Sequence, residues 1–363
     1  MSNGVKMKQF IFKSNIELRE TQTAALSDTH RQANWEEMAS HLSLWDLKRI
    51  KQFGFGRRIK PDKQFVLDAF EQHVQQTPES IAIIDGEKRL SYRELNLKAT
   101  QIAEELVHVG VRQGDYIGLF VSRSESLIVA IIASLKIGAI YIPQDAKKTP
   151  ANALKSIVEL VKPAAILTTE TCCGLLPDFN QTNTFTIENL LQRNTAFNQQ
   201  ATVSVSPTKY SDDTCFVLFT SGTTGTPNGV CVSHKNLSNI IMTQPGDLGI
   251  KPGMVVSQLL SISFDMSAWE IFGALCHGAT LILRGSDFQA TASRANVIIA
   301  TPSILARINP SLCPELETVA VAGEPCPIPL AEKWSGFCQF YNCCGPTETT
   351  IVNTMQKYHR ASR

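Results

Sequence analysis

The chain has 363 residues, of which 43% are hydrophobic and 18% are charged, so it can bury a core and is not expected to be disordered. Its formal net charge is +1, from 34 basic and 33 acidic side chains, and no basic block stands out, which argues against a nucleic-acid partner. Segment 1–15 lacks the apolar stretch of a secretory signal, and no run approaches the roughly 20 apolar residues of a membrane span. We therefore expect a soluble, cytoplasmic protein with no membrane partner.

The cysteine pattern favours neither a disulfide framework nor a metal site. Of the ten cysteines, Cys172–Cys173 and Cys343–Cys344 are adjacent pairs, and the rest are single, without any C-x-x-C spacing. Cys215 and Cys231 sit in apolar runs, where a thiol acts as a small hydrophobic group. We predict reduced, mostly structural cysteines.

Residues 1–60 are polar and lean toward helix, and they end in the Gly/Arg-rich stretch 54–58. This composition is typical of a linker or arm rather than of a core. From Phe65 the pattern changes to an amphipathic helix, with Pro78 just beyond its expected end. We predict two further units, 61–210 and 211–363, joined through a surface connection near 194–209.

The next elements are a hairpin and a capped helix. The short apolar run Ile81–Ile84, followed by Asp85-Gly86, predicts a strand and a turn. Ser91, with Glu94 three residues later, has capping-box spacing. The helix it opens presents one apolar face, made of Leu95, Ala99, Ile102, Ala103 and Leu106.

From there to the end, strand and helix patterns alternate. A helix is expected over Ser126–Leu135, and the expected strands are Tyr116–Val121, Ala164–Leu167, Phe216–Phe219, Leu281–Leu283, Val297–Ile299 and Val319–Val321. Such alternation predicts an α/β fold with buried parallel strands.

The strongest chemical signal is the segment 219–230, where an apolar strand runs into a loop of hydroxyls and glycines. Glycines let backbone N–H groups approach an anion closely, and hydroxyls add donors for phosphate oxygens. The loop residues are Thr220, Ser221, Gly222, Thr223, Thr224 and Gly225. It is not the G-x-x-x-x-G-K-[ST] loop, and composition alone is equally compatible with an ordinary polar surface turn.

This segment resembles the phosphate-binding signature T-S-G-[ST]-T-G-x-P-K-G of adenylate-forming enzymes, and other blocks follow the adenylation domains of nonribosomal peptide synthetases. Those blocks are 90–96 (LSYRELN), 135–145 (LKIGAIYIPQD), 234–237 (HKNL), 264–267 (FDMS) and 345–348 (GPTE). The resemblance implies two stacked α/β subdomains with mixed sheets flanked by helices. Segment 43–47 also weakly resembles the linker that precedes such a domain in a larger synthetase.

The resemblance also implies a reaction: an amino-acid carboxylate attacks the α-phosphorus of ATP, giving an aminoacyl adenylate and pyrophosphate. The hydroxyl loop would hold the β- and γ-phosphates, with Asn342 and Cys344 on the nucleotide as well. Thr347 would contact the α-phosphate and Glu348 would hold Mg²⁺, a cation that prefers oxygen ligands. A carrier protein or a larger synthetase is the implied partner.

Asp265 decides between branches of this superfamily. A carboxylate beside Phe264 and Met266 is costly to bury without a cation, and in the peptide-synthetase branch this position pairs with the substrate's α-ammonium. The alternative is a helix N-cap, because an apolar helical pattern follows, and both roles are compatible.

Other pocket positions follow from alignment to the same blocks. They are Met266, Trp269, Ala300, Ala320, Ala322, Cys343, Ile351 and Val352. All are apolar and several are small, which indicates room for a bulky apolar or aromatic side chain. For Ile351 and Val352 a plain core role fits equally well.

Three features depart from the family pattern. The usual loop lysine is Asn228, the usual tyrosine before G-P-T-E is Cys344, and Ala146 stands where a proline is common. The ribose-binding T-G-D block, the third barrel subdomain and the C-terminal domain with its lysine are missing from these 363 residues. The hypotheses are therefore an adenylating ligase, a degenerate fragment or interaction protein, and an acyl- or aryl-CoA ligase, the last disfavoured by Asp265.

Overall fold

The computed structural model describes residues 42–53, 59–179, 182–194, 210–220 and 228–359. The chain divides into two units, Met1–Lys60 and Pro61–Arg363, each considered by itself. In the first unit, helix α3 (Leu44–Phe53) begins where the Ser43 hydroxyl accepts the backbone N–H of Asp46 at 3.1 Å. The linker role of this unit stays a prediction.

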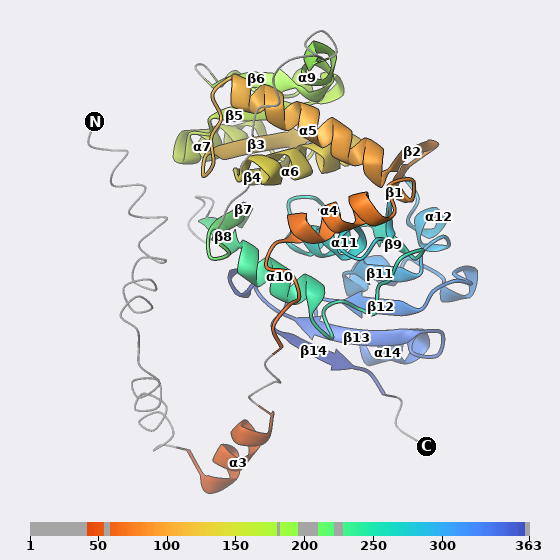
Figure 1. Cartoon of the computed structure of the whole chain (residues 1–363). Helices are drawn as coiled ribbons and strands as arrows, with labels where there is room; N and C mark the ends of the chain where they lie inside the picture. Colours follow the sequence, from red (N-terminus) through yellow and green to blue (C-terminus); the bar gives the residue numbers. More distant parts are fainter. Residues whose placement is uncertain (1–41, 54–58, 180–181, 195–209, 221–227, 360–363) are drawn as a thin grey trace. The chain divides into compact units, whose positions relative to one another are not determined.

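The second unit contains two sheets (Figure 1). The six-stranded sheet has the order β6-β5-β3-β4-β7-β8, and β8 is its antiparallel member. Its strands are β3 (Tyr116–Val121), β4 (Ile140–Asp145), β5 (Ala165–Thr168), β6 (Thr184–Thr186), β7 (Thr214–Thr220) and β8 (Asn228–Ser233).

The eight-stranded sheet has the order β14-β13-β12-β11-β9-β10-β1-β2. Its inner strands run parallel, whereas β2 and β14, at the two edges, are antiparallel to their neighbours. Its strands are β1 (Ile81–Asp85), β2 (Lys88–Ser91), β9 (Val255–Gln258), β10 (Thr280–Leu283), β11 (Val297–Ala300), β12 (Thr318–Val321), β13 (Gln339–Cys344) and β14 (Thr354–Lys357).

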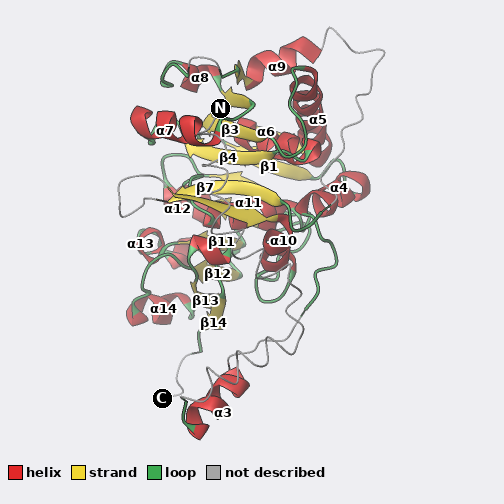
Figure 2. Cartoon of the chain, turned by 90° about the vertical axis from the view of Figure 1, so that its left-hand side faces the viewer, coloured by secondary structure: helices red, strands yellow, loops and turns green. Residues whose placement is uncertain are grey.

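Helices connect the strands and cover both sheets (Figures 1 and 2). They are α4 (Val66–Gln76), α5 (Tyr92–His108), α6 (Glu125–Ile137), α7 (Ala151–Val161), α8 (Glu170–Cys173), α9 (Ile187–Asn194), α10 (His234–Met242), α11 (Met266–Leu275), α12 (Phe288–Ala292), α13 (Pro302–Leu305) and α14 (Ile328–Trp334), with 3-10 turns η1 (Pro310–Leu312) and η2 (Thr347–Thr349).

Three hydrophobic clusters define the layers. The central core lies between the sheets and joins Leu119 of β3 and Val256 of β9 to Trp269 of α11. A second cluster packs the other face of the eight-stranded sheet against Trp334 of α14. A third packs the other face of the six-stranded sheet against Leu154 of α7. Both faces of both sheets are therefore buried, as expected for parallel strands covered by helices.

Several local expectations are confirmed. β1 and β2 form the expected hairpin, with Asp85 paired to Lys88 across the turn. The capping box is present, because the Ser91 N–H donates to Glu94 Oε2 at 2.8 Å and the Glu94 N–H donates to Ser91 Oγ at 3.2 Å. The two-sheet α/β architecture flanked by helices is the one that the family resemblance implies.

The expected boundary near residue 210 does not separate the sheets. Strands β1 and β2 belong to the first half of the chain but pair in the eight-stranded sheet, through β10. Strands β7 and β8 belong to the second half but complete the six-stranded sheet beside β4. Strand exchange in both directions makes 61–363 a single compact unit, which a boundary in sequence cannot describe.

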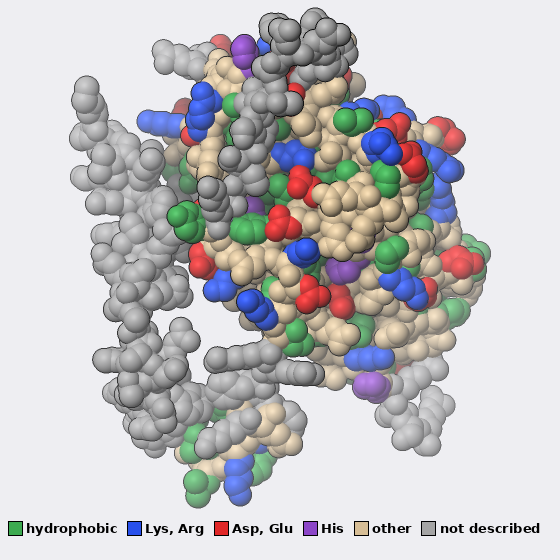
Figure 3. Space-filling model, viewed as in Figure 1, with side chains coloured by type: hydrophobic (Ala, Val, Ile, Leu, Met, Phe, Trp, Pro, Cys, Tyr) green, Lys and Arg blue, Asp and Glu red, His purple; other side chains and the backbone are tan. Residues whose placement is uncertain are grey.

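The ten cysteines are all free thiols, and Cys172, Cys215, Cys276, Cys313 and Cys343 are buried. Lys and Arg side chains are interspersed with Asp and Glu on the face of the second unit drawn in Figure 3, as the balanced net charge suggests. Among the described helices, none has the length and apolar character needed to cross a bilayer.

The buried His234 predicts an acid-sensitive fold. Its ring is 3% exposed, lies edge-on to Phe65 at 5.4 Å, and has an Nδ1 without a partner. Burial lowers the pKa of His234 from 6.5 to about 4, while the nearby Asp213 acts in the opposite direction. Between those two pH values the unfolded chain binds the proton more strongly, so stability is complete above about pH 6.5 and falls as the pH drops toward 4.

Replacing His234→Phe removes this titration and keeps an apolar ring beside Phe65. We expect the loss in free energy of unfolding between pH 6.5 and 4.5, measured by urea denaturation, to be smaller by about 2 kcal/mol in the variant. His73 and His277 also have pKa values lowered by burial, and they contribute equally to both proteins. Parallel pH profiles for the two proteins would contradict the prediction.

Candidate functional site

The predicted substrate residues gather at one edge of the eight-stranded sheet. Parallel strands end at a common edge, and the crevice beyond their carboxyl ends is where open α/β sheets bind ligands. Segment 259–265 follows β9 and leads to Asp265, Ala322 follows β12, and Gly345 follows β13. These residues are far apart in the sequence, but the strands that precede them lie close together in one sheet.

Asp265 is a buried carboxylate with an unsatisfied oxygen. It is 8% exposed, and its Oδ2 has no hydrogen-bond partner. Burial raises the pKa of Asp265 above its ordinary value, and the Thr347 hydroxyl and the backbone of Met266 and Ile351 oppose that shift. Asp265 stands at the N-cap position of α11 but makes no capping hydrogen bond with its side chain. The N-cap alternative therefore does not account for this carboxylate.

Most of the predicted pocket residues share one face. Ala320 and Ala322 alternate along β12 and its extension, and both belong to the central core. Cys343, two residues after Tyr341 on β13, faces the same side, since Ala320 pairs with Tyr341. Met266, from the first turn of α11, belongs to the same cluster and places its sulfur 3.7 Å from an ideal Cβ on Gly323. These residues form one apolar wall near Asp265.

The assignment of Ala300 to this wall is wrong. Ala300 is buried in the outer cluster, together with Val321, its pairing partner on β12. Its neighbour Ile299 belongs to the central core and pairs with Ala320. Side chains alternate along a strand, so an error of one residue moves a side chain to the opposite face. Ile299 thus occupies the place on the wall that we assigned to Ala300.

Trp269 is a core residue as much as a wall residue. It is fully buried, and its Nε1–H donates to the Gly246 carbonyl at 2.7 Å. The polar end of the indole is thus satisfied by the chain itself, and the ring contributes shape rather than a hydrogen bond to a ligand. Ile351 and Val352 also belong to the central core, 1% and 6% exposed, so the structure is compatible with both roles considered for them.

A strained turn carries Ile351. Thr350 and Ile351 both have φ of 66°, a conformation in which β-branched residues are rare. Two contacts hold the turn: the Asn236 amide donates to Thr350 Oγ1 at 3.3 Å, and the Val352 N–H donates to the Thr350 carbonyl at 2.8 Å. Asn236 belongs to α10, so this contact links the H-x-N-L block to the turn after G-P-T-E. Strain held in this way is common at functional sites.

The nucleotide residues are only partly described. Thr220 ends β7 and Asn228 begins β8, while Ser221, Gly222, Thr223, Thr224 and Gly225 lie outside the described residues. Thr347 is half-buried and Glu348 is exposed, both on η2. Asn342 and Cys344, alternate residues of β13, are exposed at the carboxyl end of that strand.

The donor set suits a magnesium ion shared with a phosphate group. Among the residues that the structure describes, no group of three or more His, Cys, Asp or Glu side chains is placed to bind a metal ion. Mg²⁺ commonly takes only one or two protein carboxylates, completing its shell with phosphate oxygens and water. The exposed Glu348 carboxylate fits that requirement.

Comparison with known proteins decides the family. The family model described as AMP-binding enzyme matches residues 70–363. This chain belongs to the AMP-binding enzyme family. Two curated relatives are adenylate-forming reductase 06235 of Coprinopsis cinerea, 38% identical over 88% of the chain, and tyrocidine synthase 1 of Brevibacillus parabrevis, 31% identical over 79%. The chain spans only 31% and 27% of these two relatives.

Solved structures show the same fold. The nonribosomal peptide synthetase FmoA3 matches with a TM-score of 0.74 and 21% identity, over 85% of this chain and 34% of that one. The N-terminal subdomain of Klebsiella oxytoca NpsA, in complex with 3-hydroxybenzoyl-AMSN, matches with a TM-score of 0.72 and 22% identity, over 82% of this chain and 76% of that one. The expected resemblance to synthetase adenylation domains is thus confirmed.

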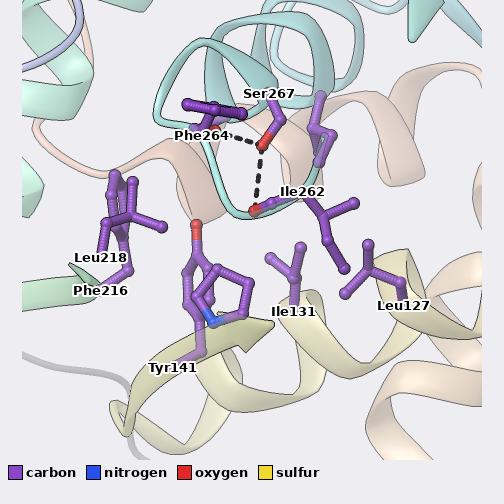
Figure 4. Close-up of a pocket in the computed structure, with 11 residues that line it drawn as sticks. Leu127, Ile131, Tyr141, Phe216, Leu218, Ile262, Phe264 and Ser267 are labelled. Atoms are coloured by element: carbon purple, nitrogen blue, oxygen red, sulfur yellow. Dashed lines mark hydrogen bonds between the residues drawn. The ribbon is translucent and has the colours of Figure 1, made fainter. Parts of the chain in front are cut away.

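One small cavity in the described part of this AMP-binding chain is too small for a substrate. A cavity of about 10 Å³ lies among Leu127 and Ile131 of α6, Tyr141 of β4 and Ser267 of α11 (Figure 4). It has room for about one water molecule, and its lining is almost wholly apolar. The Ser267 hydroxyl donates to the Phe264 carbonyl at 2.7 Å and so helps to shape the segment before Asp265.

Sequence reasoning missed a polar cluster behind Asp265. Glu270 is fully buried in α11, and Gln258 and Arg123 lie beside it. The available signal was the composition of α11, MSAWEIFGAL, in which Glu270 is the single charged residue. A lone carboxylate in an apolar helix requires buried partners, which the sequence alone does not identify.

Gly345 fixes the approach of β13 to the strained turn. A Cβ at this position would lie 2.4 Å from Val352 Cα and 2.8 Å from both Asn353 N and the Ile351 carbonyl oxygen. These are backbone atoms and cannot rotate away. We expect Gly345→Ala to lower the free energy of unfolding by more than about 2 kcal/mol, measured by urea denaturation.

Gly174→Ala is the matched control. Gly174 has φ of −70° and ψ of −8°, and a Cβ there would meet no atom within 4 Å. This change should leave stability within about 1 kcal/mol of the wild type. Equal effects of the two substitutions would show that the close approach at Gly345 is not a constraint in solution.

Proposed function

We propose that the unit 61–363 activates an amino acid by joining its carboxylate to the α-phosphate of ATP. The observation that carries the proposal is the buried Asp265 carboxylate with an oxygen left without a partner. An uncompensated buried carboxylate is costly, so its retention indicates a cationic ligand. The α-ammonium of an amino acid supplies that charge and places the substrate carboxylate nearby.

The nucleotide half of the proposed site comes from the loop between β7 and β8 and from η2. In this proposal the loop from Thr220 to Gly225 holds the β- and γ-phosphates through N–H and hydroxyl groups. Thr347 contacts the α-phosphate, and Glu348 holds Mg²⁺, which neutralises phosphate charge while the substrate carboxylate displaces pyrophosphate. Such a transfer is catalysed mainly by positioning and charge neutralisation.

The side-chain half of the proposed site is the apolar wall. Ala320, Ala322 and Cys343 are small and belong to one buried cluster with Met266 and Ile299, and in this proposal their small size makes room for the substrate side chain. Such a pocket favours a bulky apolar or aromatic amino acid, and selection by apolar volume alone is modest, about 1–3 kcal/mol per methylene.

A second candidate is a carboxylic acid without an amino group. Two curated relatives, 38% and 40% identical to this chain, are named adenylate-forming reductases and not peptide synthases, and that name specifies no amino acid. Asn228 in place of the family's lysine and Cys344 in place of its tyrosine favour a third candidate, a chain that binds nucleotide weakly without turnover. Asp265 separates the first candidate from the second, because an acid without ammonium leaves Asp265 Oδ2 unpaired.

The proposed partners follow from the length of the relatives. The chain corresponds to less than a third of tyrocidine synthase 1, and one structural neighbour is an artificial fusion of an adenylation domain and a PCP. We propose that the acyl group passes to a carrier protein or to further domains of a synthetase, in keeping with the adenylation–PCP arrangement of that neighbour.

ATP–pyrophosphate exchange tests the proposal. We expect the purified chain to catalyse exchange with a bulky apolar amino acid such as phenylalanine or leucine, and Asp265→Ala to reduce it by roughly 10²- to 10³-fold, since breaking a buried ion pair costs about 3–5 kcal/mol. The Asp265→Asn variant should lose a comparable amount, because it keeps the shape and removes the charge.

Asp287→Asn is the matched control, since Asp287 caps α12 through the Gln289 N–H at 2.8 Å and asparagine caps equally well. Its exchange rate should equal that of the wild type. Exchange with 3-phenylpropanoate in preference to phenylalanine would support the second candidate. Absence of exchange, together with no binding of a non-hydrolysable ATP analogue by calorimetry, would support the third.

A further inference from the structure

The segment that carries Asp265 is held at its base by buried side chains from two directions. Gln258 is the last residue of β9, and segment 259–265 runs from it to Asp265. The Glu270 carboxylate accepts the N–H of Leu259 at 2.6 Å and the N–H of Leu260 at 3.3 Å. The backbone donors at the start of the segment are therefore satisfied by α11, the helix at its other end.

The backbone acceptors of the same two residues are satisfied from the other sheet. Arg123 lies between β3 and α6, and its guanidinium donates to the Leu259 carbonyl at 3.1 Å and also to the Leu260 carbonyl. The N–H groups of Leu259 and Leu260 thus donate to Glu270, and their carbonyl groups accept from Arg123.

Gln258 connects the two charged side chains. Its Oε1 accepts from Arg123 Nε, and its Nε2 donates to Glu270 Oε2 at 3.0 Å and to the Leu260 carbonyl at 2.9 Å. These contacts use both ends of the amide in one orientation, so the side chain cannot flip without losing both neighbours. Gln258 is 1% exposed and Glu270 is fully buried, which strengthens each of these hydrogen bonds.

The donors and the cations around Glu270 favour an ionised carboxylate. Burial raises the pKa of Glu270 to about 8, and the Leu259 N–H, the positive charge of Arg123, the Leu260 N–H and the Gln258 amide act in the opposite direction. Every hydrogen bond described for this carboxylate comes from an N–H donor, which stabilises its ionised form. Arg284, whose Nε donates to the Leu259 carbonyl at 3.3 Å, adds a second cation on the same side.

We propose that Arg123, Gln258 and Glu270 form a positioning relay that fixes the segment carrying Asp265, at the edge of the eight-stranded sheet, relative to the carboxyl ends of β3 and β4 in the six-stranded sheet. The inference rests on the proposed function, since it assigns the relay to alignment of the two substrates. The relay touches neither substrate and acts through segment 259–265. A second tie supports the same role, because the Asp145 N–H at the end of β4 donates to Ser263 Oγ at 3.3 Å.

The test is Arg123→Lys, which keeps the positive charge but cannot hold two carbonyls and the Gln258 amide at once. We expect kcat for ATP–pyrophosphate exchange to fall at least tenfold, with the affinity for a non-hydrolysable ATP analogue within twofold of the wild type. Hydrogen–deuterium exchange of segment 259–266 should be faster in the variant, whereas exchange of β3 should not change. Glu270→Gln should reproduce these effects, because its amide presents N–H groups to donors.

Arg112→Lys is the matched control. Arg112 also donates to two backbone carbonyls, of Val107 at 2.7 Å and Val111 at 2.9 Å, after the end of α5. It should leave kcat and the exchange of segment 259–266 unchanged. The double variant Arg123→Lys with Asp265→Ala should be no slower than Asp265→Ala alone, because the relay acts through Asp265.

The outcomes separate the relay from the proposed function. If the wild type turns over and the Arg123→Lys variant has the same kcat, the relay is overturned and the proposed function stands. A lower melting temperature of the variant would not change that conclusion. Unchanged exchange of segment 259–266 in both variants would also overturn it. A wild-type chain without turnover on any amino acid would overturn the proposed function and, with it, the assignment of the relay to substrate alignment.

Discussion

The helical layer between the two sheets is apolar on both of its sides, and this fixes which strand residues can face it. Helices α6 and α11 fill the layer, so each strand must present an apolar inner face to them and another apolar face to the outer helices. The candidate polar site residues lie at or beyond the strand ends. The candidate site lies there because the carboxyl ends of β9, β12 and β13 are where the burial requirement ends.

A carboxylate at the margin of such a core needs a positive partner. Glu270 and Asp265 are two such carboxylates, and they differ in the partners that the fold provides. Glu270 receives N–H donors on both oxygens and has arginines nearby, so its charge is compensated within the fold. Asp265, at the N-cap of the same helix and five residues earlier, keeps an oxygen without a partner. The contrast between a satisfied and an unsatisfied carboxylate on one helix is the physical basis for giving one a positioning role and the other a substrate role.

Local sequence signals predicted local structure well. The hairpin at β1–β2 and the capping box at Ser91 depend on residues a few positions apart, and both are present. Ala320, Ala322 and Cys343 follow from alignment to the family's blocks, and the structure places them on one face of the sheet. The assignment of Ala300 to the wall was wrong. All residues of β11 are buried, so the sequence shows no alternation that would tell which of them face inward. The boundary near 210 stays an approximate prediction, because strands from each half of the chain join the sheet of the other half.

The buried relay shows what local patterns leave out. Arg123 and Gln258 are 135 residues apart, and nothing in the sequence near either one specifies the other. Their contact follows from the order of strands in two sheets, which brings the loop after β3 against the end of β9. In the proposed site Thr220 ends β7 of the six-stranded sheet, whereas Asp265, Thr347 and Glu348 lie at the edge of the eight-stranded sheet. Hydrogen bonds are directional, whereas apolar contacts are not. The hydrogen bonds of Arg123, Gln258 and Glu270 at the start of segment 259–265 therefore set the position of that segment relative to the six-stranded sheet. The apolar core between the sheets does not set this position by directional contacts.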